Sequence, residues 1–131
     1  MPKVLVIDDD AEVRLLICTM LQRGGGYETV EAPSGPAGIA AFGKGGIDAI
    51  VTDLIMPSPT GIETIVQLRT LDPGVPIVAV SGFGWDESSP LVREALRVGA
   101  NRTLGKPFRA DELIGMMKEL IRPRSEPTAT S

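Results

Sequence analysis

The chain has 131 residues, of which 43% are hydrophobic, and this suits one globular domain with its own core. Its 13 basic and 17 acidic residues give a net charge of −4 with no block of like charge, which argues against direct binding of nucleic acid. Histidine is absent, which excludes histidine catalysis and most zinc sites, so any bound metal must be a hard cation with oxygen ligands.

The remaining global features indicate a cytoplasmic protein. Cys18 is the single cysteine, so an internal disulfide is excluded, and its place beside the apolar face of a helix suits a small, inert core residue. No stretch approaches the about 20 continuous apolar residues that a membrane span needs. The N-terminus enters a strand pattern without a signal peptide, so we expect a reducing, cytoplasmic setting and no membrane contact.

Strand-like and helix-like segments alternate along the chain. Cap signals mark the helices: Asp10 before the first, Ser34 before the second, Thr60 with Glu63 as a capping box, and Ser89 followed by Pro90. The glycines at 24–26 and at 99 end two of these helices. The predicted strands are residues 3–7, 27–32, 49–53, 75–80 and 103–104, each followed by a predicted helix.

This alternation predicts a single α/β domain over residues 1–122. The strand that ends at Asp53 has no polar face, which is typical of a strand buried on both sides in a parallel sheet. Right-handed crossovers then place helices on both faces and give a three-layer sandwich with a five-stranded parallel sheet. Residues 123–131 are rich in Pro, Ser and Thr and are expected to be a disordered tail.

Polar side chains follow the predicted strands where those strands end. Asp8 and Asp9 follow the first strand, Asp53 ends the third, Ser81 ends the fourth and Lys106 follows the fifth. Parallel strands bring these ends to one edge of the sheet, where such folds bind ligands. Neighbouring carboxylates repel each other unless a cation lies between them, and Mg²⁺ suits few carboxylates with waters and a phosphate oxygen. Lysine and serine would stabilise a phosphoryl group on Asp53.

Taken together, these motifs resemble the receiver domain of two-component response regulators. The resemblance covers roughly residues 3–121 and implies a flavodoxin-like, CheY-like sheet with strand order 2-1-3-4-5. The matching motifs are Asp8-Asp9 after an apolar strand, Asp53 with Met56-Pro57 and Gly61, Ser81-Gly82, and Gly99-Ala100 before Lys106-Pro107-Phe108.

The resemblance also implies a role for each residue of the site. Asp53 would be the phospho-acceptor, and the Lys106–Pro107 peptide bond would be cis. Ser81 would be the hydroxyl that moves toward the phosphoryl group, with Lys106 as the salt-bridge partner of that group. Mg²⁺ would be bound by Asp9, Asp53 and the backbone carbonyl of Ile55, with Asp8 acting through water.

The implied partners are those of a signalling module and not of an enzyme. A sensor histidine kinase or phosphotransfer protein would supply the phosphoryl group, and a downstream protein or a fused output or kinase domain would respond. Met116 and Leu120 broaden the apolar face of the last helix, either as deeper core or as a surface for a homodimer or other partner. Ile55 and Phe83 occupy the positions that flank the attacking water in this family, and because both are apolar we expect slow loss of phosphate.

Three features depart from the family pattern. Thr103 stands where a switching aromatic is usual, so a Tyr or Phe rotamer change cannot report phosphorylation here. Gly105 replaces an aliphatic strand residue and weakens the fifth strand. The segment 83–89 is longer than in compact members and contains Trp85, which either replaces the missing aromatic as a moving or partner-facing element or covers apolar surface.

Two other classes of protein compete with this interpretation. An aspartyl-phosphate enzyme of the haloacid dehalogenase type would use Asp8, since Asp8-Asp9-Asp10 contains Asp-x-Asp. That family places Thr or Val where Glu12 stands, and it leaves Asp53 unexplained. A flavodoxin-like cofactor carrier would need a hydroxyl-rich phosphate loop after the first strand, where three aspartates would repel phosphate.

Overall fold

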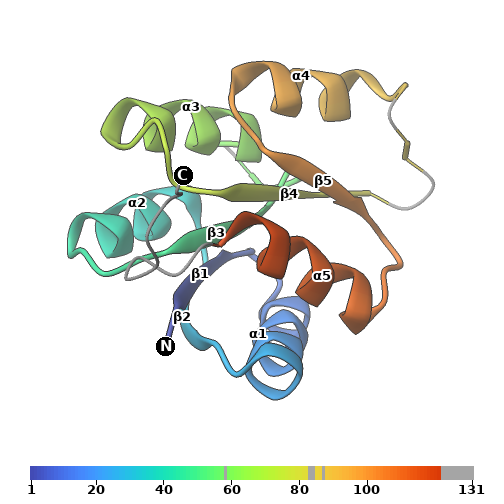
Figure 1. Ribbon diagram of the computed structural model, residues 1–131. Helices are drawn as coiled ribbons and strands as arrows, with labels where there is room; N and C mark the ends of the chain where they lie inside the picture. Colours follow the sequence, from blue (N-terminus) through green and yellow to red (C-terminus); the bar gives the residue numbers. More distant parts are fainter. Residues whose placement is uncertain (58, 83–84, 87, 122–131) are drawn as a thin grey trace, which may run out of the picture.

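The computed structural model describes residues 1–57, 59–82, 85–86 and 88–121. Within these residues strands and helices alternate without exception (Figure 1). The strands are β1 (Lys3–Ile7), β2 (Glu28–Ala32), β3 (Ala49–Asp53), β4 (Ile77–Ser81) and β5 (Arg102–Gly105). The helices are α1 (Ala11–Gly25), α2 (Gly35–Gly43), α3 (Gly61–Leu71), α4 (Pro90–Val98) and α5 (Ala110–Leu120). The predicted tail, 123–131, lies outside the described residues.

All the strands pair in parallel in the order β2-β1-β3-β4-β5, which confirms the predicted sheet. The register places Asp53 of β3 opposite Val80 of β4, and Ser81 of β4 opposite Gly105 of β5. Because the strands are parallel and nearly in step, their carboxyl ends meet at one edge of the sheet. Residues that follow these strands are therefore neighbours in space although they are far apart in sequence.

The helices cover both faces of the sheet, as a parallel sheet requires (Figure 1). Alternate residues of each strand point to opposite faces. In β1, Val4 and Val6 join the core beneath α1 and α5, whereas Leu5 and Ile7 join the core beneath α2, α3 and α4. All four of these side chains are fully buried. This two-sided burial explains why the central strands lack a polar face.

The first helix, α1, is the longest, with 15 residues. Its N-cap is Asp10, whose carboxylate accepts hydrogen bonds from the N–H groups of Glu12 at 2.9 Å and Val13 at 3.3 Å, as predicted. Only the last of the three glycines ends it: Gly26 has φ 68°, in the left-handed region that favours glycine. Cys18 is buried, as predicted. Among the described residues, no helix has the length and apolar character needed to cross a lipid bilayer.

The capping box of α3 is confirmed, but the predicted cap of α4 is not. Thr60 Oγ1 accepts from Glu63 N–H at 3.3 Å, and the Glu63 carboxylate accepts from Thr60 N–H at 2.6 Å. Ser89 is the N-cap residue of α4, and Pro90 begins that helix. Its hydroxyl, however, accepts from the N–H of Asp86 at 3.1 Å and makes no bond to the helix. The preceding turn therefore competes successfully for this side chain.

Arg69 connects three segments at the edge of the sheet where β4 begins. Its Nε donates to the carbonyl of Gly99 at 3.0 Å, and its terminal nitrogens donate to the carbonyls of Asp72 at 3.2 Å and Val75 at 2.6 Å and to Asn101 Oδ1 at 2.8 Å. Gly99 has φ 136°, and a side chain there would collide with Arg69. This guanidinium thus joins the end of α3 to the turn between α4 and β5.

Candidate functional site

Three aspartates meet where β1 and β3 end. Asp8 and Asp9 follow β1, and Asp53 is the last residue of the adjacent strand β3. One carboxylate oxygen from each of the three lies within 4.8 Å of the others. The sequence predicted that these carboxylates would lie together, because parallel strands end at the same edge of a sheet. In the structure they do lie together.

Asp8 is the buried member of this cluster, with 1% of its surface exposed. Its Oδ1 accepts a hydrogen bond from Asp10 N–H at 2.9 Å, but its Oδ2 is buried and has no hydrogen-bond partner in the part of the chain that the structure describes. Burial, and to a smaller extent the neighbouring charge of Asp53, raise the pKa of Asp8 to about 6. The hydrogen bond from Asp10 lowers this pKa but does not offset the effect of burial. A buried carboxylate oxygen without a partner is costly, so a cation beside it would be stabilising.

Asp53 is 6% exposed and has polar neighbours that stabilise its charge. Its Oδ1 accepts from Ile55 N–H at 3.2 Å, and its Oδ2 lies 3.8 Å from Lys106 Nζ. Burial nevertheless raises the pKa of this carboxyl, because it outweighs the Ile55 hydrogen bond and the Lys106 charge, and Asp9 raises the pKa further. The lysine is close enough to neutralise charge that develops on Asp53 and far enough to leave space between them.

Lys106 and Ser81 reach this edge from β5 and β4. The Lys106–Pro107 peptide bond is cis, as the resemblance implied. Ser81 is buried at the end of β4, and its hydroxyl donates to the carbonyl of Leu104 at 3.5 Å, a long hydrogen bond. In this conformation the hydroxyl is thus directed to the neighbouring strand.

An open hollow lies above Asp53. The described residues that line it include all the predicted site residues except Asp8 and Ser81. Three further lining residues were not assigned to the site from the sequence: Asp10, which was predicted only as a helix cap, Gly82 and Trp85. Phe83, on which the expectation of slow phosphate loss also depended, lies outside the described residues. The lining residues are Asp9, Asp10, Asp53, Ile55, Gly82, Trp85 and Lys106.

Gly61 fixes the loop that follows Asp53. A Cβ atom at this position would overlap the carbonyl oxygen of Asp53 and lie 2.6 Å from the Cα of Leu54, so only glycine allows this approach of α3. Its N–H also donates to the Leu54 carbonyl at 3.4 Å. The start of α3 is therefore packed directly against the backbone that carries the acceptor carboxylate.

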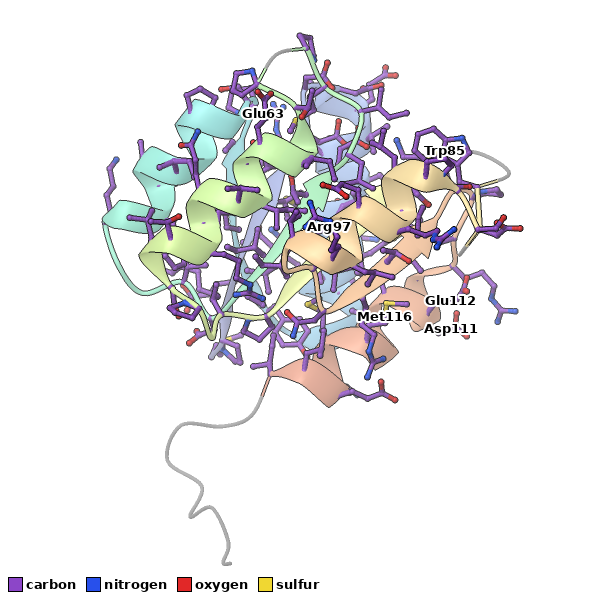
Figure 2. All side chains as sticks on the ribbon, turned by 90° about the horizontal axis from the view of Figure 1, so that it is seen from above. Glu63, Trp85, Arg97, Asp111, Glu112 and Met116 are labelled. Atoms are coloured by element: carbon purple, nitrogen blue, oxygen red, sulfur yellow. The ribbon has the colours of Figure 1, made fainter. Side chains whose placement is uncertain are left out.

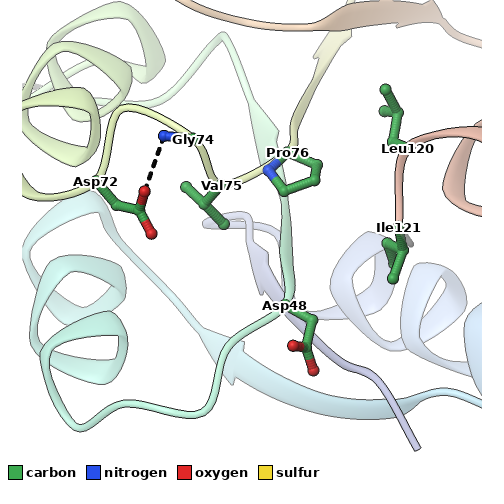
Figure 3. A pocket seen from close by; sticks show the side chains of 7 residues that line it. All are labelled: Asp48, Asp72, Gly74, Val75, Pro76, Leu120 and Ile121. Carbon is green, nitrogen blue, oxygen red and sulfur yellow. Dashed lines mark hydrogen bonds between the residues drawn. The ribbon is translucent and has the colours of Figure 1, made fainter. Parts of the chain in front are cut away.

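A second pocket lies at the opposite edge of the sheet, near the amino ends of β3 and β4 (Figure 3). Its two carboxylates already have partners: Asp72 accepts from Gly74 N–H at 2.8 Å, and Asp48 accepts from Lys3 N–H at 2.9 Å. None of the described residues that line it is a lysine or arginine, so these residues supply no positive charge for a phosphoryl group. The residues that line it are Asp48, Asp72, Gly74, Val75, Pro76, Leu120 and Ile121.

The family model described as the response regulator receiver domain matches residues 4–118. The chain belongs to this receiver family. The receiver is 37% identical over 134 residues to the transcriptional regulatory protein PrrA of Mycobacterium tuberculosis, an alignment that covers 99% of this chain and 54% of that protein. It is 27% identical to the chemotaxis protein CheY of Bacillus subtilis, covering 91% of this chain and 97% of CheY.

Solved structures agree with this assignment. The chemotaxis protein CheY4 of Vibrio cholerae superposes on the receiver with a TM-score of 0.82 at 31% identity, covering 92% of this chain and 99% of that one. The receiver spans about half the length of the first curated relatives that it matches.

The site of this receiver fits a hard divalent cation. Its donors are carboxylate oxygens from three residues, and one of these residues, Asp8, has a buried oxygen, Oδ2, with no hydrogen-bond partner among the described residues. Oxygen donors of this kind, few in number and open to solvent on one side, suit Mg²⁺. When bound, such an ion would supply positive charge beside the oxygens of a phosphoryl group.

Asp8 should make the stability of the metal-free receiver depend on pH. The native state holds the Asp8 proton more tightly than the unfolded chain does, since its pKa is raised from 3.8 to about 6. Stability from this group is therefore present at low pH and is lost as the pH rises through about 6, by roughly 2 kcal/mol between about pH 4.5 and 7. Urea unfolding of the wild type and Asp8→Asn in EDTA at both pH values measures this difference.

The comparison isolates Asp8, because the wild type and the variant share all their other titrating groups. We expect Asp8→Asn to gain stability relative to the wild type as the pH rises. An equal difference at the two pH values would contradict the prediction.

Proposed function

We propose that the receiver accepts a phosphoryl group on Asp53 in a Mg²⁺-dependent reaction and thereby changes a protein-binding surface. The donor is a sensor histidine kinase or phosphotransfer protein in the cytoplasm. The observation that carries this proposal is the position of the Asp53 carboxylate, which lines an open hollow 3.8 Å from Lys106 and within reach of Asp8 and Asp9. The module acts as a switch and not as an enzyme with its own substrate.

The chemistry follows from this arrangement. A carboxylate oxygen of Asp53 attacks the phosphorus of a phosphohistidine, the N–P bond breaks, and its electron pair stays on the imidazole nitrogen, which takes a proton from solvent. The product, an acyl phosphate, adds nearly two negative charges and three acceptor oxygens at a fixed point. Lys106 Nζ is near enough to pair with those oxygens. Asp9, Asp53 and the Ile55 carbonyl would hold Mg²⁺, with Asp8 acting through water.

Ser81 is the residue through which the signal leaves the site. Its present hydrogen bond to the Leu104 carbonyl is long, at 3.5 Å, so little is lost when the hydroxyl turns to a phosphoryl oxygen. Because Ser81 is the last residue of β4, this movement displaces the loop that leads into α4. Shifting such an equilibrium from mostly off to mostly on takes about 5 kcal/mol, which a few charge-assisted hydrogen bonds supply.

The signal then passes to another protein surface. The downstream element is a separate protein target or an output or kinase domain of the same polypeptide, because the first relatives are about twice as long as this chain. Met116 and Leu120 are partly buried against the core beneath α1 and α5, which favours deeper core over a partner surface, the two roles left open by the sequence. A homodimer through neighbouring surface residues of α5 is a further proposed assembly.

Asp53 is a better nucleophile candidate than Asp8, the residue that a haloacid dehalogenase-like phosphatase would use. Asp8 is 1% exposed and does not line the hollow, whereas Asp53 does. A phosphodonor approaching from solvent therefore meets Asp53 first. A flavodoxin-like carrier is disfavoured because the three carboxylates would repel the phosphate of a cofactor.

Mapping of the modified residue tests the proposal. The wild-type chain is incubated with acetyl phosphate and Mg²⁺, the labile acyl phosphate is reduced with borohydride to homoserine, and peptides are sequenced by mass spectrometry. We expect homoserine at position 53 alone. Modification at position 8 would instead support the phosphatase interpretation, and the absence of any modification would refute both.

A further inference from the structure

We propose that Trp85 forms one side of the acceptor hollow and slows the hydrolysis of the Asp53 acyl phosphate by excluding water from that side. The inference rests on the proposed function and adds a residue that controls how long the phosphoryl group stays on Asp53. Trp85 lines the hollow together with Asp53, Ile55 and Lys106. Figure 2 shows it at the N-terminal end of α4, with Arg97 at the opposite end of that helix.

Two glycines allow Trp85 to lie this close to the site. The Trp85 N–H donates to the carbonyl of Gly82 at 3.2 Å, which holds Trp85 close to the end of β4. The indole then lies on Gly82, where an added Cβ would be only 3.2 Å from its Cε2 atom. On the neighbouring strand end, an added Cβ on Gly105 would lie 3.3 Å from the carbonyl oxygen of Trp85.

These contacts account for the departure at Gly105. The sequence placed a glycine where an aliphatic strand residue is usual, at a cost to β5. In the structure the atoms nearest to an added Cβ at this position are the Trp85 carbonyl oxygen and the Ser81 hydroxyl, the latter at 3.5 Å. A side chain there would require the Trp85 backbone to shift by a few tenths of an ångström. The glycine that weakens β5 thus also leaves room for the backbone of Trp85.

The indole matters because of how the acyl phosphate is hydrolysed. A water oxygen attacks the phosphorus from the side opposite Asp53, the bond between phosphorus and the Asp53 oxygen breaks, and the carboxylate is regenerated with inorganic phosphate, which takes up the proton of the water. That water must enter through the hollow. Neither Ile55, which is 52% exposed, nor Trp85 has a side-chain acid or base that could activate it. A site from which water is excluded protects a reactive intermediate.

The rate of phosphate loss tests this inference. Wild type, Trp85→Ala, Trp85→Phe and Gly82→Ala are phosphorylated with acetyl phosphate, freed of donor, and followed by the decay of the phosphorylated species on a phosphate-affinity gel. We expect Trp85→Ala to lose phosphate about fivefold faster than the wild type, because water gains access. Trp85→Phe should stay within about twofold, and Gly82→Ala, which displaces the ring, should fall between them.

Thermal unfolding of each unphosphorylated variant shows whether it is folded. Decay of folded Trp85→Ala at the wild-type rate would overturn the inference and leave the proposed function intact. Equal acceleration in Trp85→Phe and Trp85→Ala would also overturn it, because a ring at this position would then not matter. Failure of the wild type to take up phosphate would instead refute the proposed function itself.

Discussion

Replacing Asp53 by asparagine is expected to abolish phosphoryl uptake. The amide of the new side chain cannot attack phosphorus as a carboxylate does, and the cluster loses one of the three carboxylate oxygens that lie within 4.8 Å. The fold should persist, because burial already raises the pKa of Asp53 and a neutral amide avoids that penalty. Incubation with acetyl phosphate and Mg²⁺, followed by intact-mass measurement, should show no adduct for the variant and a phosphoryl adduct for the wild type.

Asp10→Asn is the matched control. Asp10 lines the same hollow but serves as the N-cap of α1, and asparagine caps a helix equally well. It also lowers the negative charge by the same amount. We expect this variant to take up phosphate at a rate close to that of the wild type. If both variants lost uptake, net charge at the sheet edge would explain the result, and Asp53 would lose its special role.

Substituting Gly61 by alanine is expected to destabilise the receiver by about 3 kcal/mol, at the upper end of the usual cost of overpacking. The added methyl group would overlap the Asp53 carbonyl and lie 2.6 Å from Leu54 Cα, and backbone atoms cannot turn aside as a flexible side chain can. The strand end that carries Asp53 must therefore shift. Urea denaturation measures the stability loss, and slower phosphorylation at a temperature where the variant is folded measures the displacement of the acceptor.

Gly115→Ala provides the comparison for this prediction. Gly115 lies inside α5 with nothing within 4 Å of an added Cβ, so alanine should stabilise the protein by about 0.5–1 kcal/mol through its higher helix propensity. The same chemical change thus has opposite signs at the two positions. Equal effects would mean that the close approach of α3 to β3 does not constrain the chain.

The fold and the centre of the site could be predicted because both depend on local signals that act together. An apolar strand without a polar face must be buried on both sides, and alternation with helices then requires parallel pairing. Once the strands are parallel, Asp8, Asp53 and Lys106 are brought to the same edge whatever the loops do. The 3.8 Å separation of Asp53 and Lys106 is in line with that reasoning.

Contacts that depend on a single side chain choosing between partners could not be predicted in this way. The Ser89 hydroxyl is bonded to the Asp86 N–H instead of to its own helix, and both choices are local and similar in free energy. The four hydrogen bonds of Arg69 reach segments up to 32 residues away, which no periodicity reveals. The contact of Trp85 with Gly82, with its hydrogen bond from the Trp85 N–H to the Gly82 carbonyl, likewise has no sequence signature.

The Arg69 hydrogen bonds also determine how α4 can move. They hold the Gly99 end of this helix to the end of α3, whereas the described hydrogen bond of the Ser89 hydroxyl, at the other end, is to Asp86 in the preceding loop. A helix that is held at one end moves most at the other end. If Ser81 moves, α4 should therefore tilt about Gly99, and Leu91, near the Ser89 end, should be displaced more than Leu96.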